Sequence, residues 1–451
     1  MTNTPEQLSD WDLHHHWHAF TQMAEYRPLV IERAEGCWLV DHEEKRYLDG
    51  VSSMWCNLFG HRHPRIDAAI REQLDRVAHN TSLGMGNATT ARLAKRLADL
   101  APGDLEHVFF ASDGSSAVES ALKMAFQYWR QVPEPRPEKT KFLALGEAYH
   151  GDTLGSASVG GIDRFNLMFA PLFFDVFRVP SPDRRHDARF HLDHLEQVLA
   201  EHHGEIAAMV VEPLVQGAAG IVLHPPGYLA GVRELTRKYD VLLIADEIVT
   251  GFGRTGRMFA CEQEGVVPDF LCLGKGITGG YLPLSATITR PEIYQAFLGP
   301  ATSVRTFMHG HTYGGNPLAA AAALATLDIL QKERVLETLP AKFELLADLL
   351  TRVAEHPRVA ETRQLGLIAA VELTPSSDRT ERYPTEVRIA HRICSETLKR
   401  GVWLRPLGDV LVIMPPLSIG AEELGLLGDV LAASIDAATS AVGNSSLVGR
   451  A

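Results

Sequence analysis

Residues 241–256 read VLLIADEIVTGFGRTG, and the first seven of them decide the fold class. Five apolar residues lead directly to two carboxylates, Asp246 and Glu247. A short run rich in Val, Ile and Leu is typical of a parallel strand that is buried on both faces. In an open α/β sheet, ligands bind beyond the carboxyl ends of such strands. We therefore expect Asp246 either at a ligand-binding edge or as a cap of the segment that follows.

The stretches before and after this one also indicate a buried, mostly parallel sheet. Short apolar runs alternate with helical patterns, and this alternation predicts an α/β fold with a mostly parallel sheet. Helices and strands after about residue 330 predict a second, smaller α/β lobe. The runs are HVFFAS (107–112), KFLALG (141–146), IAAMVVEP (206–213), FLCLG (270–274), LIAAVEL (367–373) and VLVIMPPL (410–417).

The composition excludes several function classes. The chain has 451 residues and a formal net charge of -13, and its basic residues are scattered, so we expect no nucleic-acid-binding face. Five cysteines without a CxxC pair argue against a disulfide framework or a structural zinc site. The N-terminus has no basic start followed by an apolar run, and no eighteen consecutive residues are apolar. We expect no signal peptide, no membrane span and a cytoplasmic location.

Three consecutive histidines, His14 to His16, raise the question of a metal site. Histidine is a common ligand of transition metals. The usual ligand sets add carboxylates or cysteines, and no such pattern nearby completes a site. We therefore expect no metal.

A second predicted strand end carries a lysine between two glycines. The segment PDFLCLGKGITGGYLPLSA (268–286) places Lys275 just after an apolar run. Partial desolvation would lower the pKa of its amine, which must be deprotonated to attack an aldehyde. A P-loop is excluded because no GxxxxGK[ST] surrounds this lysine. The alternative is an ordinary solvated loop lysine.

Two more strand ends carry candidate ligand-binding residues. SDGSS (112–116) joins a strand to a helix N-terminus, whose N–H groups and dipole favour an anion. Gly114 and Ser115 are the best phosphate candidates, although an ordinary N-cap has the same composition. Tyr149 follows KFLALG and would stack on a planar ligand, unless it is simply a core or surface tyrosine.

Together, the four strand ends would bring an anion site, an aromatic ring, a carboxylate and a lysine to one crevice. That set suits pyridoxal phosphate and few other ligands. Lys275 would carry the cofactor as a Schiff base. Asp246 would keep the pyridine nitrogen protonated, which makes the ring an electron sink.

At this point the chain resembles a known family. LLIADEIVTGFGRTG (242–256), followed by GKGITGGYLPLSA (274–286), is similar to the signature of the class III aminotransferases, a fold-type-I pyridoxal-phosphate family. The resemblance implies a large cofactor-binding domain over residues 64–330. It also implies a small α/β domain formed by residues 1–63 and 331–451, and a homodimer with active sites at the interface.

Within the class, the chain resembles the biotin-pathway branch that converts 8-amino-7-oxononanoate to 7,8-diaminononanoate. DGVSSMWCNLFGHRHP (49–64), FMHGHTYGGNPLA (307–319) and VWLRPLGDVLVIMPP (402–416) carry this resemblance. His311 and Thr312 would reach the phosphate of the neighbouring subunit's cofactor, and Arg405 would hold the substrate carboxylate. The residues implied are Lys275 and Asp246 for catalysis; Gly114, Ser115, Tyr149, His311 and Thr312 for the cofactor; Phe20, Trp55, Tyr149, Gly310 and Arg405 for the substrate; and Asp152 and Arg254 as supporting residues.

Two positions leave the amino donor open. Some members of the branch have Tyr where this chain has Phe20, and some have Pro where it has His311. Both features resemble the Bacillus-type enzymes, in which lysine rather than S-adenosylmethionine can be the donor.

The overall reaction has rival interpretations within the same fold. One is an omega-amino-acid or ornithine-type aminotransferase, and another is an aminomutase, which needs no separate donor. A non-catalytic cofactor-binding protein would require the loss of Lys275 or Asp246, and both are present.

Overall fold

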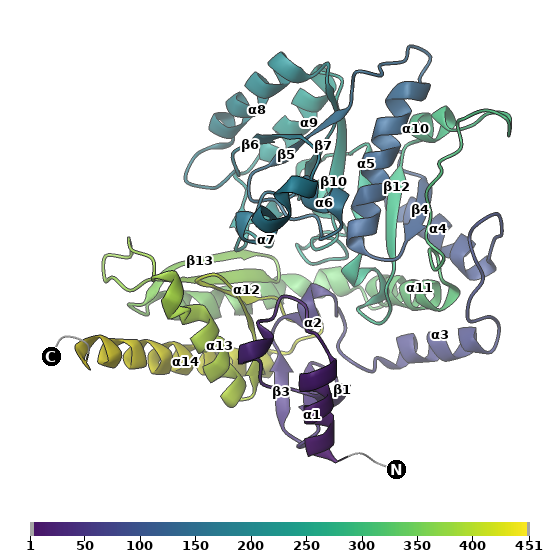
Figure 1. Cartoon of the computed structure of the whole chain (residues 1–451). Coiled ribbons are helices and arrows are strands. Elements are labelled where there is room, and N and C mark those ends of the chain that lie inside the picture. Colours follow the sequence, from purple (N-terminus) through teal and green to yellow (C-terminus); the bar gives the residue numbers. More distant parts are fainter. Residues whose placement is uncertain (1–3, 449–451) are drawn as a thin grey trace.

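The computed structural model describes residues 4–448 and is built around a seven-stranded sheet (Figure 1). The strand order is β4-β12-β11-β10-β7-β5-β6. This sheet confirms the predicted α/β class, and each apolar run predicted in this region forms a strand. The strands are β4 (His107–Ala111), β5 (Lys141–Leu145), β6 (Val176–Val179), β7 (Ile206–Val211), β10 (Leu242–Asp246), β11 (Phe270–Leu273) and β12 (Ser285–Thr289).

Two strands of this sheet, β6 and β12, were not predicted, and β12 is the one whose direction breaks the parallel pattern. It lies between β11 and β4 and runs antiparallel to both, whereas the pairings among β11, β10, β7, β5 and β6 are parallel. Its sequence, SATIT, is short and half polar, yet all five residues are buried. Thr287 and Thr289 are accommodated because their hydroxyls donate to the carbonyls of Ala117 at 2.8 Å and Asp269 at 3.0 Å.

Helices cover both faces of the sheet, so that successive strand residues enter opposite cores. In β10, Leu242 and Ile244 belong to the core cluster that contains α5, whereas Leu243 and Ala245 belong to the other cluster, which contains residues of α8, α9 and α11. This two-sided burial explains why the strand is apolar without alternation. The helices around the sheet are α3 (Pro64–Leu74), α4 (Ala88–Leu100), α5 (Gly114–Gln131), α6 (Leu154–Ser158), α7 (Asp163–Asn166), α8 (Ala188–His202), α9 (Tyr228–Lys238), α10 (Pro291–Ala296) and α11 (Pro317–Lys332).

A second lobe combines segments from both ends of the chain (Figure 1). Its first sheet has the order β1-β2-β3-β15, and Val402 of β15 pairs with Leu48 of β3. Its second sheet has the order β13-β14-β17-β16. We propose domain boundaries near residues 63 and 330 on this basis. The elements are α1 (Pro5–His15), β1 (Ile31–Glu35), β2 (Trp38–Asp41), β3 (Arg46–Asp49), α2 (Ser52–Trp55), α12 (Val335–Ala354), β13 (Val359–Leu365), β14 (Ile368–Leu373), α13 (Ile389–Lys399), β15 (Val402–Trp403), β16 (Arg405–Leu407), β17 (Val410–Ile413) and α14 (Ala421–Val448).

The shorter elements connect these parts. A two-stranded ribbon pairs β8 (Val215–Gln216) with β9 (Val222–Leu223). The 3₁₀ turns are η1 (Met23–Glu25), η2 (Leu167–Leu172), η3 (Ala260–Glu264), η4 (Lys275–Thr278) and η5 (Thr385–Val387). Turn η1 belongs to the N-terminal segment, and turn η4 begins at Lys275.

Helix α14 contains a stretch, Ala421–Ala441, that is long and apolar enough to cross a membrane by composition alone. The helix packs against α12 and α13. Leu424, Leu427 and Leu431 are buried in the core. Packing of one face within the small lobe therefore accounts for its apolar character.

Behind the active-site edge, a buried ion pair ties α9 to the central strands. Asp269 accepts hydrogen bonds from both terminal nitrogens of Arg233, at 2.7 and 3.0 Å, and from the backbone N–H of Leu243 at 2.7 Å. Arg290 adds a contact at 2.9 Å. Because Asp269 and Arg233 are both buried, removing the carboxylate charge leaves a buried guanidinium without its partner.

Asp269→Asn should therefore lower the free energy of unfolding by about 3 kcal/mol, measured by urea denaturation. The matched control is Asp99→Asn, which removes an exposed carboxylate paired with Lys95 on α4 and should change stability little. Equal losses in the two variants would show that burial of the Arg233 pair has no special role.

Candidate active site

Five strand ends meet at one edge of the seven-stranded sheet. Helix α5 begins after β4, Lys275 follows β11, and Asp246 ends β10. Glu212 directly follows β7, and Tyr149 lies four residues beyond β5. Because these strands all run in the same direction, their carboxyl ends lie together. The predicted crevice thus gathers four of the predicted elements and one carboxylate that was not predicted.

Asp246 lies at the centre of the crevice and is 5% exposed. Its Oδ2 is 2.7 Å from Nδ1 of the fully buried His150 ring, and its Oδ1 accepts the backbone N–H of Ile248 at 3.1 Å. Burial lowers the pKa of His150, but the hydrogen bond and charge of Asp246 outweigh it, so this pKa lies above its usual value. The carboxylate therefore caps the following turn and also holds an imidazole.

Glu212 is a second buried carboxylate beside this pair. Its Oε1 accepts the backbone N–H of Tyr149 at 3.1 Å, and its Oε2 accepts that of Gly217 at 2.8 Å. Burial raises the pKa of Glu212 to about 7, and the negative charge of Asp246 adds to the effect, while His150 opposes it. The sequence prediction missed Glu212 and His150. The signal for Glu212 was present, because the apolar run IAAMVV is followed directly by a carboxylate, just as VLLIA is.

Lys275 opens the 3₁₀ turn η4 with a left-handed φ of 42°. Its Nζ lies 5.7 Å from the centre of the Trp55 ring. Burial lowers the pKa of the amine, although the charge of Asp246 opposes this shift. The flanking glycines allow neighbouring side chains to pack closely. At Gly276, for example, a Cβ would lie 3.2 Å from the Leu58 side chain.

The start of α5 is packed tightly against the strand ends. A Cβ at Gly114 would lie 2.8 Å from the Ile248 side chain, so only glycine fits there without displacement. Asp113 is the N-cap, and its Oδ1 accepts the N–H of Ser116 at 2.9 Å. The positive end of the helix dipole thus faces the crevice that contains Asp246 and Lys275, and it is a suitable position for a phosphate.

Tyr149, Asp152 and Ser115 form a short chain of hydrogen bonds beside α5. The Tyr149 hydroxyl donates to Asp152 Oδ2 at 2.7 Å, and the Asp152 N–H donates to Ser115 Oγ at 3.2 Å. These contacts fix the position of the Tyr149 ring relative to the helix N-terminus. Tyr149, Asp152 and Ser115, which were predicted separately, therefore belong to one hydrogen-bonded group.

Trp55 lies on a strained backbone. Ser52, Ser53, Met54 and Trp55 all have left-handed φ values, between 46° and 71°, an arrangement that is costly for residues with a Cβ. Ser52 is held by its hydroxyl, which donates to the carbonyl of Met414 at 2.7 Å. The strained turn places the buried Trp55 ring beside Lys275 and against Gly217, where a Cβ would lie 3.5 Å from the ring.

Arg254 supports this turn from behind. It is completely buried and donates to the carbonyl of Pro415 and, at 3.4 Å, to the Ser52 hydroxyl. Burial lowers its pKa to about 10. Arg254 thus links the start of the turn that carries Trp55 to the chain at Pro415.

Phe20 reaches the crevice through a row of aromatic rings. Its ring packs edge-on against Phe165 at 5.4 Å between centres, and Phe165 packs edge-on against Tyr149 at 5.9 Å. Phe20 itself is 61% exposed. It therefore lies at the outer end of the row, and Phe165 is a further member of the row that the sequence did not single out.

Three predicted residues lie on an exposed segment before α11. His311 Nδ1 is 3.2 Å from the Ser112 hydroxyl, next to the start of α5. Gly310 and Thr312 are exposed, and a Cβ at Gly310 would lie 3.1 Å from Leu83. The single chain thus places His311 near its own helix N-terminus, and it leaves Thr312 on the surface.

Arg405 begins β16, a strand of the small lobe. It is half-buried and lies close enough to His391 and Cys394 of α13 for its charge to influence both. Within residues 4–448 its guanidinium has no ion-pair partner. Among these residues, no carboxylate therefore competes with an anionic ligand for this guanidinium.

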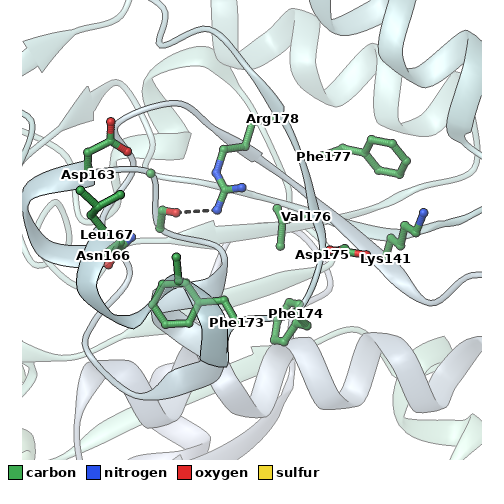
Figure 2. A pocket seen from close by; sticks show the side chains of 13 residues that line it. Lys141, Asp163, Asn166, Leu167, Phe173, Phe174, Asp175, Val176, Phe177 and Arg178 are labelled. Carbon is green, nitrogen blue, oxygen red and sulfur yellow. Dashed lines mark hydrogen bonds between the residues drawn. The ribbon is translucent and has the colours of Figure 1, made fainter.

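A separate surface cavity of about 590 Å³ lies beside the edge strand β6 (Figure 2). Phe173, Phe174 and Arg178 are among the residues that line it. None of the candidate site residues contributes to its walls. This cavity is therefore separate from the candidate site at the strand ends.

The groups at the strand ends fit pyridoxal phosphate. Asp246 offers a buried carboxylate for a protonated ring nitrogen, Lys275 an amine, and the α5 N-terminus a phosphate site. Two buried nitrogens, Trp55 Nε1 and His150 Nε2, have no hydrogen-bond partner among the described residues. Such atoms are costly to bury alone, which is consistent with a polar ligand in the crevice.

Comparison with known proteins agrees with this arrangement. The family model for Aminotransferase class-III matches residues 21–435. The adenosylmethionine-8-amino-7-oxononanoate aminotransferase of Nitratidesulfovibrio vulgaris is 50% identical over 96% of this chain and 82% of its own length. The enzyme of the same name from Geobacter sulfurreducens is 48% identical and covers 96% of this chain and 98% of its own length.

Two solved structures share the fold. The enzyme of that name from Methanocaldococcus jannaschii has a TM-score of 0.92 and 41% identity, with 96% of this chain and 99% of the other covered. An (S)-enantioselective omega-transaminase from Thermomicrobium roseum has a TM-score of 0.92 and 37% identity, with 97% and 100% covered. With its lysine, carboxylate and helix N-terminus at the same sheet edge, this chain belongs to the class III family of pyridoxal-phosphate-dependent aminotransferases.

Proposed function

We propose that this enzyme transfers an amino group to the ketone of 8-amino-7-oxononanoate and so forms 7,8-diaminononanoate, a step of biotin synthesis. The observation that carries the proposal is the name shared by several relatives that are 41–50% identical over at least 90% of this chain. Each of them is called an adenosylmethionine-8-amino-7-oxononanoate aminotransferase. The crevice supports the proposal, because Trp55 supplies an apolar wall and Arg405 lies in the same lobe without a paired carboxylate among the described residues.

Each residue at the strand ends would have a different role in an amino transfer. When bound, pyridoxal phosphate supplies an electron sink and stores the amino group between the two half-reactions. Asp246 would hold the ring nitrogen protonated, and His150 fixes the carboxylate in place. Lys275 would hold the cofactor and would move the proton at the donor carbon, because burial lowers the pKa of its amine and favours the unprotonated form that can act as a base. Gly114 and Ser115 would hold the phosphate at the start of α5.

The amino donor is proposed to be S-adenosylmethionine, as the names of the relatives indicate. Lysine is the alternative, because Phe20 at the mouth lacks the hydroxyl that tyrosine would provide. A second candidate function is that of an omega-transaminase, since such an enzyme shares the fold at 37% identity.

A homodimer is proposed from the exposed apolar residues around the segment before α11. Leu83 is 65% exposed, Val304 94%, Met308 83% and Tyr313 64%. Exposed groups of this size are typical of a protein interface. In such a dimer, His311 and Thr312 would be placed to reach the cofactor phosphate of the partner subunit.

A cytoplasmic location is also proposed. All five cysteines are unpaired, which is typical of proteins in a reducing compartment. The net charge of -13 suits a soluble enzyme that acts on small molecules.

The function is tested by a turnover assay with 8-amino-7-oxononanoate and a panel of amine donors. We expect 7,8-diaminononanoate with S-adenosylmethionine, and with lysine if the alternative donor is used. Turnover of simple omega-amino acids or ketones, with none of 8-amino-7-oxononanoate, would favour the omega-transaminase. Conversion of one substrate without any donor would indicate an aminomutase.

Lys275→Ala should reduce multiple-turnover activity at least about 1000-fold, because proton transfer and cofactor attachment both depend on this amine. Borohydride treatment of the wild-type enzyme should leave the cofactor on the peptide that contains Lys275, as measured by mass spectrometry. The control is Lys95→Ala, which removes an exposed lysine of α4 and should leave activity unchanged. A cofactor label on another lysine would refute the assignment.

Glu212→Gln should change how stability depends on pH. The pKa of Glu212 in the folded protein is about 7, above its ordinary value of 4.5. The wild type therefore loses stability as pH rises from 4.5 through 7, while glutamine does not titrate. In urea denaturation of the apoenzyme, the wild type should lose about 2–3 kcal/mol relative to Glu212→Gln between pH 5 and pH 8. A stability difference that is independent of pH would contradict the raised pKa.

Arg405→Ala should raise the apparent KM for the keto acid about tenfold or more, because a charge-assisted contact with the substrate carboxylate is lost. The donor half-reaction, followed by the cofactor spectrum in a single turnover, should change much less. Arg400→Ala is the control, since that arginine pairs with Glu396 on the surface. If Arg405→Ala impaired only the donor half-reaction, the carboxylate assignment would be wrong.

A further inference from the structure

A cluster of possible metal ligands lies in the N-terminal segment, outside the active site. Asp12 lies on α1, His16 caps the carboxyl end of that helix, and His18 follows two residues later, outside the helix. The chain turns away at His16, and this turn brings His18 back to Asp12. One ligand atom from each of the three residues lies within 4.8 Å of the other two.

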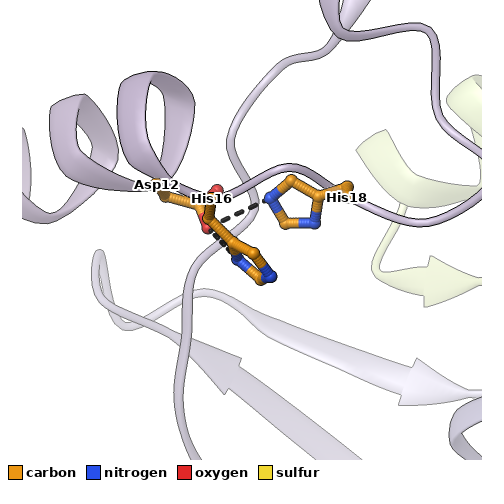
Figure 3. Close-up of side chains that lie close together, drawn as sticks. All are labelled: Asp12, His16 and His18. Atoms are coloured by element: carbon orange, nitrogen blue, oxygen red, sulfur yellow. Dashed lines mark hydrogen bonds and ion pairs between the residues drawn. The ribbon is translucent and has the colours of Figure 1, made fainter.

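The two distances from Asp12 to the histidines suit a single cation. His16 Nδ1 and His18 Nε2 each lie 3.1 Å from Asp12 Oδ1 (Figure 3). Ligands at about 2.1 Å from a metal are separated by about 3.0 Å at a right angle and about 3.4 Å in a tetrahedron. A divalent ion could therefore replace the protons now shared between the carboxylate and the two rings, with small side-chain movements.

Surrounding contacts already orient two of the three ligands. The Tyr26 hydroxyl donates to Asp12 Oδ2 at 2.7 Å, and the His18 ring packs on the Tyr26 ring at 4.3 Å between centres. The side chains of Asp12 and His18 are only 17% and 24% exposed, whereas His16 is 65% exposed. The hydrogen bond from Tyr26 holds the Asp12 carboxylate in place from the side opposite the two imidazoles' shared oxygen, since it uses Oδ2 while His16 and His18 contact Oδ1. An outer hydrogen bond of this kind is typical of metal-ligand carboxylates.

We propose that Asp12, His16 and His18 form a binding site for a divalent transition metal of the Zn²⁺ class, with water completing the coordination. Two imidazoles and one carboxylate are ligands that such ions accept, and the open positions suit a site at the surface. Binding would join the end of α1 to the segment that leads to Phe20 at the mouth of the active site.

The structure supplies a carboxylate partner that the sequence did not reveal. The run His14 to His16 was judged to lack a carboxylate partner, but Asp12 lies one helical turn before His16 and supplies it. Of the three consecutive histidines, only His16 belongs to the cluster. His14 instead lies 3.0 Å from Asp10.

The test uses the full-length holoenzyme without a histidine tag, freed of metal by a chelator. Zn²⁺ binding is measured by calorimetry, and Co²⁺ binding by its visible ligand-field bands. We expect one ion per chain, with an unchanged cofactor spectrum, which shows that the metal is not on the cofactor. His16→Ala and His18→Gln should each weaken binding at least about tenfold.

The matched controls are His14→Ala and His15→Ala, which change neighbours of the same histidine run and should leave affinity unchanged. Tyr26→Phe keeps the ring, removes the hydroxyl that orients Asp12, and should weaken binding. Absence of stoichiometric binding would overturn the proposal. Equal losses of affinity in the control and ligand variants would also overturn it, because they would show that the metal binds the histidine run as a whole. Retention of binding in a His16→Ala/His18→Gln double variant would do the same.

Discussion

The rest of the active site depends on the contact between Asp246 and His150. A carboxylate at the end of a buried strand is costly unless its charge is met by hydrogen bonds or a cation. One oxygen of Asp246 holds the imidazole and the other caps the following turn. The neighbouring Glu212 has a raised pKa partly because Asp246 is charged, and the charge of Asp246 opposes the lowering of the Lys275 pKa by burial. A single buried charge thus influences the protonation of the groups around it.

The residues beside Lys275 come from parts of the chain that cannot meet without the complete fold. Trp55 is carried by a left-handed turn in the N-terminal segment, and that turn is held by Arg254 from the large domain and by the backbone near Pro415. The strain of the turn is tolerated because burial and hydrogen bonds fix it from several sides. The position of Trp55 beside Lys275 therefore requires that both lobes be folded against each other.

Much of this could be predicted from local sequence, because strand ends are local features. VLLIADE and FLCLGK each contain an apolar run and the residue delivered by it, so Asp246 and Lys275 could be located before the fold was known. His150 was missed because its importance comes from a contact with a neighbouring strand rather than from spacing along the chain. Glu212 was missed although it follows an apolar run just as Asp246 does. The strand β12 was missed because its threonines are buried only through bonds to distant carbonyls. Asp12 was overlooked because a helical turn, not adjacency, brings it to His16.

The central claim is that Asp246 holds the cofactor ring in its protonated form, and the most direct test is the steady-state rate of Asp246→Asn. Asparagine keeps the size of the side chain and removes its charge. If the claim is right, kcat/KM should fall by at least about 100-fold, corresponding to a loss of about 3 kcal/mol, while circular dichroism and thermal unfolding show a folded protein. A folded variant with a rate close to that of the wild type would contradict the claim, and it would reduce Asp246 to a cap of the turn that follows β10.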